Sequence, residues 1–93
     1  MIRSFRCQET ERVFLGQPTH AFPPDIIRTA QRKLKYLDGA RSLRDLQSPP
    51  GNRPERLRGN RAGQWSIRIN DQWRICFTWE GPDPEAVEIV DYH

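Results

Sequence analysis

The chain has 93 residues, which is enough for one small domain with a limited hydrophobic core. Apolar residues make up 35% of it and charged residues 29%, so much of the sequence belongs on the surface. No apolar run approaches the roughly 20 residues that a membrane-spanning helix needs, and the N-terminus lacks the apolar stretch of a secretory signal. The two cysteines, Cys7 and Cys76, lie far apart and without metal-ligand spacing. We therefore expect a cytoplasmic protein with reduced thiols, no metal or other cofactor and no membrane association.

The N-terminal half predicts two helices. Residues 2–5 predict a short first strand, and residues 8–15 predict a short helix that ends at Gly16. A second helix is expected from Pro24 to about Asp38, because proline followed by an acidic residue is typical of a helix start. The apolar residues of this segment recur at helical spacing and predict its buried face. They are Ile27, Ala30, Leu34 and Leu37.

The C-terminal half predicts strands. Turn-forming residues at 48–52 end regular structure. Residues 64–69 and 72–79 alternate between apolar and polar side chains, and residues 86–91 provide a last strand. Helices that precede strands predict an α+β domain, in which two N-terminal helices pack on one face of an antiparallel sheet. A single domain is expected to span residues 1–93.

The loop between the two central strands decides which side chains share a face of the sheet. A two-residue loop would place apolar residues opposite polar ones. A three-residue loop of residues 70–72 instead pairs Ile67 with Ile75 and brings the apolar side chains to one face. In that register Arg68 lies directly opposite Arg74 on the polar face, and like charges so placed destabilise a sheet. The pair is either two side chains that extend into water or a site for a polyanion that neutralises them.

Arginine dominates the basic residues, since only Lys33 and Lys35 of the fifteen are lysines. Six arginines lie between Arg53 and Arg74, whereas the chain after residue 79 carries acidic residues and no lysine or arginine. A guanidinium group binds phosphate through two parallel hydrogen bonds and stacks on bases. The pattern indicates either a solvated charged face or, as the sharper interpretation, a surface that binds RNA or DNA.

Three motifs occur in the order found in a known family. They are LRGNRAGQWSIRI at residues 57–69, QWRICF at residues 72–77 and VEIVDYH at residues 87–93. In this combination the chain resembles the HigB branch of the RelE/ParE superfamily of toxins, and the resemblance covers nearly all of it. It implies a compact βααβββ domain of the RelE-like fold. It also implies the toxin of a type II toxin–antitoxin system, which enters the ribosomal A site and cleaves mRNA there.

The resemblance implies an endoribonuclease reaction that needs no metal. The ribose 2′-hydroxyl attacks the adjacent phosphate, so the site requires a base, cations for the developing charge and an acid for the leaving oxygen. By position in the motifs, Arg74 is the candidate for stabilising the phosphate. Asp91, Tyr92 and His93 match the functional motif at the family's C-terminus. Among them, His93 is suited to proton transfer near neutral pH, and Tyr92 to stacking on a base or donating a proton.

Two positions depart from the family pattern. Arg58 stands where relatives often have lysine, and its guanidinium shifts the role towards electrostatics because it is a poor proton donor or acceptor. Glu55 stands where some relatives carry histidine, which leaves the identity of the general base open. The remaining arginines of this region are expected to bind RNA. They are Arg53, Arg56, Arg61 and Arg68.

The resemblance also implies partners. They are a helix-turn-helix antitoxin of the HigA type, the ribosome with its mRNA, and operator DNA reached indirectly through the antitoxin. Two alternatives remain at this point. A ParE-like toxin would poison DNA gyrase on a similar fold, although the Asp-Tyr-His ending is not expected there. A non-catalytic RNA-binding module would use the same arginines, bind in a salt-dependent manner and cleave nothing.

Overall fold

A computed structural model describes residues 1–92 of the chain, which form an α+β fold. The helices are α1 (Gln8–Leu15) and α2 (Pro24–Gly39). Three short 3₁₀ turns follow, η1 (Leu43–Gln47), η2 (Pro50–Asn52) and η3 (Gly59–Arg61). The strands are β1 (Glu55–Arg56), β2 (Gln64–Arg68), β3 (Trp73–Thr78) and β4 (Glu85–Asp91). Within residues 1–92, no helix is long and apolar enough to cross a membrane.

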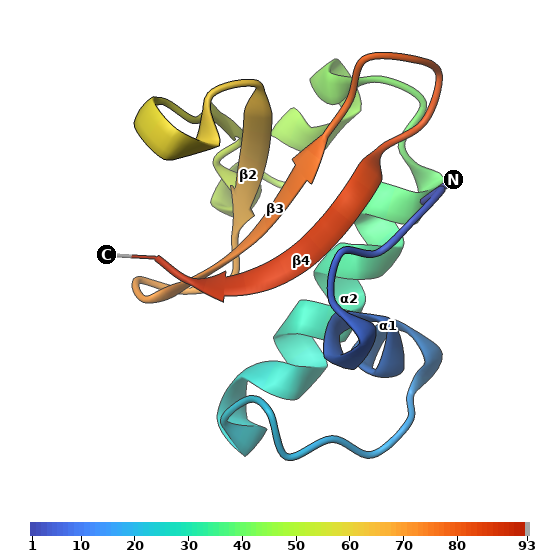
Figure 1. Cartoon of the computed structure of the whole chain (residues 1–93), viewed down its shortest axis with the longest axis vertical. Helices are drawn as coiled ribbons and strands as arrows, with labels where there is room; N and C mark the ends of the chain where they lie inside the picture. Colours follow the sequence, from blue (N-terminus) through green and yellow to red (C-terminus); the bar gives the residue numbers. More distant parts are fainter. Residues whose placement is uncertain (93) are drawn as a thin grey trace.

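The four strands form one antiparallel sheet in the order β1-β2-β3-β4. In Figure 1, α1 and α2 lie together on the side of β4, and the yellow turn that contains η3 lies at the other edge, beside β2. The C-terminal end of β4 reaches the loop that joins β2 to β3, where the backbone N–H of Tyr92 donates to the carbonyl of Gln72 at 2.7 Å. The sheet therefore brings residue 92 to the end of the central hairpin.

The expected first strand is only a single parallel bridge between Phe5 and Val87. Two hydrogen bonds hold it beside β4: Arg6 N–H donates to the Val87 carbonyl at 3.0 Å, and Val87 N–H donates to the Ser4 carbonyl at 3.1 Å. Helix α1 begins at Gln8 and directs the chain away from the sheet, so the bridge does not continue into a strand paired with β4. The strand expected at residues 2–5 was thus wrong in extent, although the segment does lie against the sheet.

Both helices begin and end where their sequences indicate. Gly16 ends α1 with a φ of 74°, and its N–H donates to the Val13 carbonyl at 3.1 Å. A residue with a side chain would be strained in that left-handed conformation. Pro24 opens α2, where the missing N–H of proline has no helical partner to lose.

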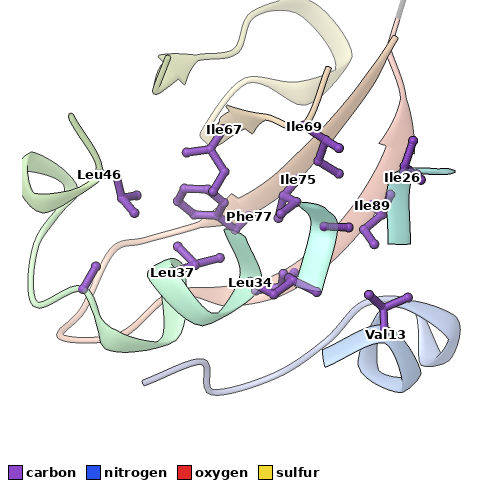
Figure 2. Close-up of a cluster of buried hydrophobic side chains, with 13 residues drawn as sticks. Val13, Ile26, Leu34, Leu37, Leu46, Ile67, Ile69, Ile75, Phe77 and Ile89 are labelled. Atoms are coloured by element: carbon purple, nitrogen blue, oxygen red, sulfur yellow. The ribbon is translucent and has the colours of Figure 1, made fainter. Parts of the chain in front are cut away.

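The hydrophobic core lies between α2 and the helix-facing side of the sheet. Figure 2 shows Leu34 and Leu37 of α2 facing Ile67, Ile75 and Phe77 of β2 and β3, and all five side chains are fully buried. Three tryptophans that share the phase of these strand residues pack around them while remaining half-buried. They are Trp65, Trp73 and Trp79.

The central hairpin has the register that the apolar pattern predicts. Ile67 pairs with Ile75 and Arg68 with Arg74, which confirms the three-residue loop. The side chain of Asn70 stabilises that loop, because its Oδ1 accepts hydrogen bonds from the backbone N–H groups of Gln72 at 2.9 Å and Trp73 at 2.7 Å. The polar residues of β2 and β3 therefore share the face of the sheet turned away from the helices, which we call the outer face.

Lys33 is buried on the apolar side of α2, where the sequence pattern gives no reason to expect a lysine. Its Nζ donates to the carbonyl of Arg68 at 2.6 Å and to that of Gly51 at 3.3 Å. The lysine thus ties α2 both to the end of β2 and to the turn that precedes β1.

Candidate active site

One row of side chains crosses the outer face through all four strands. Glu55 pairs with Ser66, Ser66 with Cys76, and Cys76 with Glu88. Residues directly opposite one another on antiparallel strands point to the same face, so the row has a carboxylate at each end and a hydroxyl and a thiol between them. Both Ser66 and Cys76 are fully buried, so groups from above cover the middle of the row.

Arg74 lies in the adjoining row and reaches back towards Glu55. Its Nη1 donates to Glu55 Oε2 at 2.9 Å and to Ser66 Oγ at 3.0 Å. The ring of Tyr92 lies over the same guanidinium, with 5.3 Å between the ring centroid and Cζ of Arg74. The Arg74 side chain is only 19% exposed. A carboxylate, a hydroxyl and an aromatic ring therefore fix the direction of this guanidinium.

A pocket of about 440 Å³ opens beside Glu55 and Tyr92, two residues that contact Arg74. Tyr92 forms one wall, and the segment from Glu55 to Arg58 forms the rest. The backbone N–H of Leu57 donates to the carbonyl of Gln64 at 2.9 Å, which continues the pairing of β1 with β2 and holds this segment against the sheet. The pocket thus combines two arginines, a carboxylate and a phenol, the chemical groups expected for binding a phosphate next to a base.

The structure brings some of the predicted residues into this site and leaves others outside it. Arg74, Tyr92 and Arg58 come together, and Glu55 and Arg56 join them. The other predicted arginines do not line the pocket and have different contacts. Arg53 is exposed before β1, Arg68 Nη2 contacts Asp71 in the hairpin loop, and Arg61 contacts Gln64 and Glu88.

Asp91 lies on the side of the sheet opposite to Arg74. It pairs with Trp73, whereas Arg74 pairs with Val90. Its Oδ2 accepts a hydrogen bond from Gln72 Nε2 at 3.0 Å, at the hairpin loop. The alternation of β4 already contains this information, because Asp91 has the same phase as Val87 and Ile89, which face the core. His93, the other candidate from this motif, lies outside the described residues.

Ser66 is a contact of Arg74 that the sequence motifs did not single out as a site residue. The hairpin register places it on the correct face, but its burial depends on the groups packed above it. The same burial, together with a smaller effect of Glu88, raises the pKa of the Cys76 thiol to about 11 against the opposing effect of Arg61 and Arg74. The thiol is therefore protonated at neutral pH and is not a nucleophile.

The described part of the chain contains no group of three or more histidine, cysteine, aspartate or glutamate residues arranged to hold a metal ion. The chemical groups of the pocket are instead arginines, one carboxylate and one phenol.

Comparison with known proteins shows the family. A model of HigB-like toxins, described as RelE-like toxins of type II toxin–antitoxin systems, matches residues 3–93. The chain belongs to the HigB-like toxin family. Toxin HigB-1 of Vibrio cholerae is 41% identical over 80 residues, which cover 85% of this chain and 84% of that protein. Endoribonuclease HigB of Proteus vulgaris is 28% identical over the full length of both chains.

Among solved structures, a YoeB/ParE toxin from Agrobacterium tumefaciens matches 99% of this HigB-like chain and 97% of its own, with a TM-score of 0.49 and 19% identity. Membership of a type II toxin–antitoxin family implies that an antitoxin is the partner of the chain.

Proposed function

We propose that this HigB-like toxin is an endoribonuclease that cleaves mRNA in the ribosomal A site. The observation that carries the proposal is the arrangement of Arg74, whose guanidinium is directed by Glu55, Ser66 and Tyr92 beside an open pocket. The printed name of the Proteus vulgaris relative, Endoribonuclease HigB, supports the same activity. The two arginines that line the pocket, Arg56 and Arg58, suit a phosphate-bearing substrate.

The reaction is an internal transesterification of RNA. The 2′-oxygen of the ribose attacks the neighbouring phosphorus, and the bond from that phosphorus to the 5′-oxygen of the next nucleotide breaks. The proton of the 2′-hydroxyl passes to a base, and an acid donates a proton to the departing 5′-oxygen. The products are a 2′,3′-cyclic phosphate and a 5′-hydroxyl end. All bonds are exchanged within the substrate, so this scheme requires only proton transfer and stabilisation of charge.

Arg74 and Arg58 supply the positive charge in this scheme. The phosphorane that forms during attack carries more negative charge on its oxygens than the starting diester, so guanidinium groups that face it lower the barrier. Glu55, Ser66 and Tyr92 already orient Arg74. Arg58 lines the pocket from the segment that follows β1. A phosphate that enters the pocket replaces Glu55 as the partner of Arg74.

Proton transfer is assigned to Glu55 and His93. The Glu55 carboxylate lines the pocket and is 55% exposed, so it accepts the 2′-hydroxyl proton once the phosphate has taken its place on Arg74. His93 is the proposed donor to the leaving oxygen, because it follows Tyr92 directly in the chain. Tyr92 positions Arg74 and offers its ring to a base of the message. Asp91 has no direct role in this scheme.

The partners follow from the same proposal. A helix-turn-helix antitoxin of the HigA type binds the toxin and connects it to operator DNA, and ribosomes with their mRNA provide the substrate in the cytoplasm. Arg56 lines the pocket and binds the RNA there, and Arg53, Arg61 and Arg68 are proposed to bind the RNA backbone outside it.

A reconstituted translation system tests the proposal. Purified protein is added to ribosomes that translate a defined message, and the fragments are mapped together with the chemistry of their ends. We expect cleavage by the wild-type protein that leaves 5′-hydroxyl ends, and intact mRNA with the Arg74→Ala variant. Intact mRNA with the wild-type protein would reject the proposal, and inhibition of DNA gyrase in the same preparation would favour a gyrase poison instead.

A further inference from the structure

The two carboxylates at the ends of the outer-face row differ in their burial. Glu55 is 55% exposed, whereas the side chain of Glu88 is only 14% exposed. Each has an arginine as its partner: Arg74 contacts Glu55, and Arg61 Nη2 lies 3.6 Å from Glu88 Oε1. An exposed carboxylate is readily displaced by a phosphate, but a buried one stays with its cation. We therefore expect Glu88 to stay paired with Arg61 when RNA binds.

Arg61 lies on a turn that does not by itself fix the direction of its side chain. It is the last residue of η3, and the residues on both sides of it, Asn60 and Ala62, are exposed. Two acceptors hold the guanidinium over the sheet: Gln64 Oε1 accepts from Nη1 at 3.1 Å, and Glu88 provides the charged contact. Without them a long and flexible side chain on a surface turn samples many rotamers.

Glu88 itself is held from its other side. Arg6, in the segment that runs beside β4, places its Nε 3.4 Å from Glu88 Oε2. The carboxylate thus lies between two arginines, and only one of them belongs to the region of the pocket. The arrangement leaves Glu88 little freedom to follow Arg61, so Arg61 is oriented by Glu88 rather than the reverse.

The guanidinium groups of Arg61 and Arg74 converge on the same part of the outer face. Arg61 contacts Glu88, which pairs with Cys76 on one side, and Arg74 donates to Ser66, which pairs with Cys76 on the other. They reach this place from different elements, η3 and β3. Two guanidinium groups over one buried thiol form a surface that can bind two phosphates of one RNA strand.

We propose that Glu88 is a positioning residue, which holds Arg61 beside Arg74 so that the two arginines bind neighbouring phosphates of one RNA strand. The inference rests on the proposed function, since it assigns a role in binding the same substrate. Glu88 contacts no RNA in this arrangement, and its effect passes entirely through Arg61.

The direction in which a charge-removing substitution changes RNA affinity separates this role from simple electrostatics. Glu88→Gln is nearly isosteric and removes one negative charge close to the RNA, so a general charge effect strengthens binding. If Glu88 instead orients Arg61, the same substitution weakens binding. Glu85→Gln is the matched control, because Glu85 is an exposed carboxylate on the same strand whose loss removes an equal charge.

Single-turnover cleavage of ribosome-bound mRNA, with the protein in excess, gives a maximal rate and a half-saturating concentration. We expect Glu88→Gln and Arg61→Ala each to raise the half-saturating concentration about tenfold and to leave the maximal rate largely unchanged. The double variant should equal Arg61→Ala alone, because the two residues act in series. Each should also reduce the salt dependence of binding by the equivalent of one contact, a slope change of about 0.7 for single-stranded RNA.

Arg61→Lys provides a second variant that changes only an exposed turn. Lysine keeps the charge but lacks the fork that contacts two acceptors, so we expect a loss close to that of Arg61→Ala. Wild-type affinity in Glu88→Gln, or in Arg61→Lys, would overturn the positioning role while the wild-type protein still cleaves. If the wild-type protein cleaves nothing, the proposed function itself has failed.

Discussion

Arg74 Nη1 lies 2.9 Å from Glu55 Oε2, although the two residues are 19 positions apart in the chain. The contact crosses from β3 to β1 over the buried hydroxyl of Ser66, which accepts from the same nitrogen. Before substrate binds, the catalytic cation of the proposed mechanism is thus paired with the proposed base. This pairing keeps both groups in place and also makes them compete with the phosphate, so their substitution should separate binding from chemistry.

Replacement of Arg74 tests the proposed stabilisation of the phosphorane. Arg74→Ala should lower mRNA cleavage on the order of 100- to 1,000-fold, the usual effect of removing one strong donor to a transition state. Thermal unfolding should change little, because the side chain lies outside the hydrophobic core. Arg28→Ala, which removes an exposed cation from α2, is the control for net charge and should cleave normally. Full activity of Arg74→Ala would remove this residue from the mechanism.

Replacement of Glu55 distinguishes a base from a mere partner of Arg74. Glu55→Gln removes the proton acceptor and also frees Arg74 for the phosphate. We expect tighter RNA binding together with cleavage that is slower by at least about 100-fold, within the usual contribution of general acid–base catalysis. The two effects are measured in the same single-turnover titration. Faster cleavage would mean that Glu55 only shields Arg74, and the base would have to be sought elsewhere.

Lys33 should contribute to stability although it is a buried cation. Lys33→Met keeps the apolar stem but leaves the carbonyls of Arg68 and Gly51 without this donor, which should cost about 1–3 kcal/mol. Urea unfolding measures the difference. The exposed neighbour offers a control, because Lys35→Met should cost less than about 1 kcal/mol, the value of its contact with the Phe14 ring. Equal stability of Lys33→Met and wild type would show that these hydrogen bonds add nothing.

The same lysine should make stability depend on pH in the alkaline range. Burial first, and then Arg32 and Arg68, lower the pKa of Lys33 below its ordinary value of 10.5 in the folded protein. Between that lowered pKa and 10.5 the unfolded chain binds more protons than the folded one, so the contribution of Lys33 to stability rises with pH. The free-energy difference between wild type and Lys33→Met should shift in favour of wild type as the pH approaches 10.5. A shift in the other direction would contradict the sign of this pKa change.

The sequence predicts those parts of the fold that follow from periodicity. Alternation in β2 and β3 admits only one register that buries Ile67 and Ile75, so the position of Arg68 opposite Arg74 follows without a structure. The strand β1 could not be predicted in this way, because it has two residues and both are exposed and charged. Its pairing with β2 nevertheless brings Glu55 to Arg74.

The contacts of the site depend on packing that no local pattern contains. The burial of Glu88 between Arg6 and Arg61 requires three separate segments, and the burial of Lys33 requires two carbonyl groups at the ends of other elements. Alternation in β4, by contrast, already separates Asp91 from Arg74. The family motif includes both Asp91 and Tyr92, whereas the structure places the Tyr92 ring over Arg74 and Asp91 on the opposite side of the sheet.

The assignment of His93 as proton donor is tested by replacing each of the two histidines in turn. His93→Gln keeps the size and hydrogen-bonding capacity of the side chain but does not titrate near neutral pH. It should slow cleavage by about 100-fold or more and leave thermal stability and binding of the antitoxin unchanged. His20→Gln, in the exposed loop between α1 and α2, is the matched control and should behave like wild type.

The pH dependence of cleavage tests the role of His93 more directly. If His93 donates the proton, cleavage by wild type falls as the pH rises through the range in which histidine loses its charge, and His93→Gln lacks that fall. A variant that cleaves as fast as wild type, or that retains the same alkaline decline, would move the acid to Tyr92, whose ring already lies against Arg74.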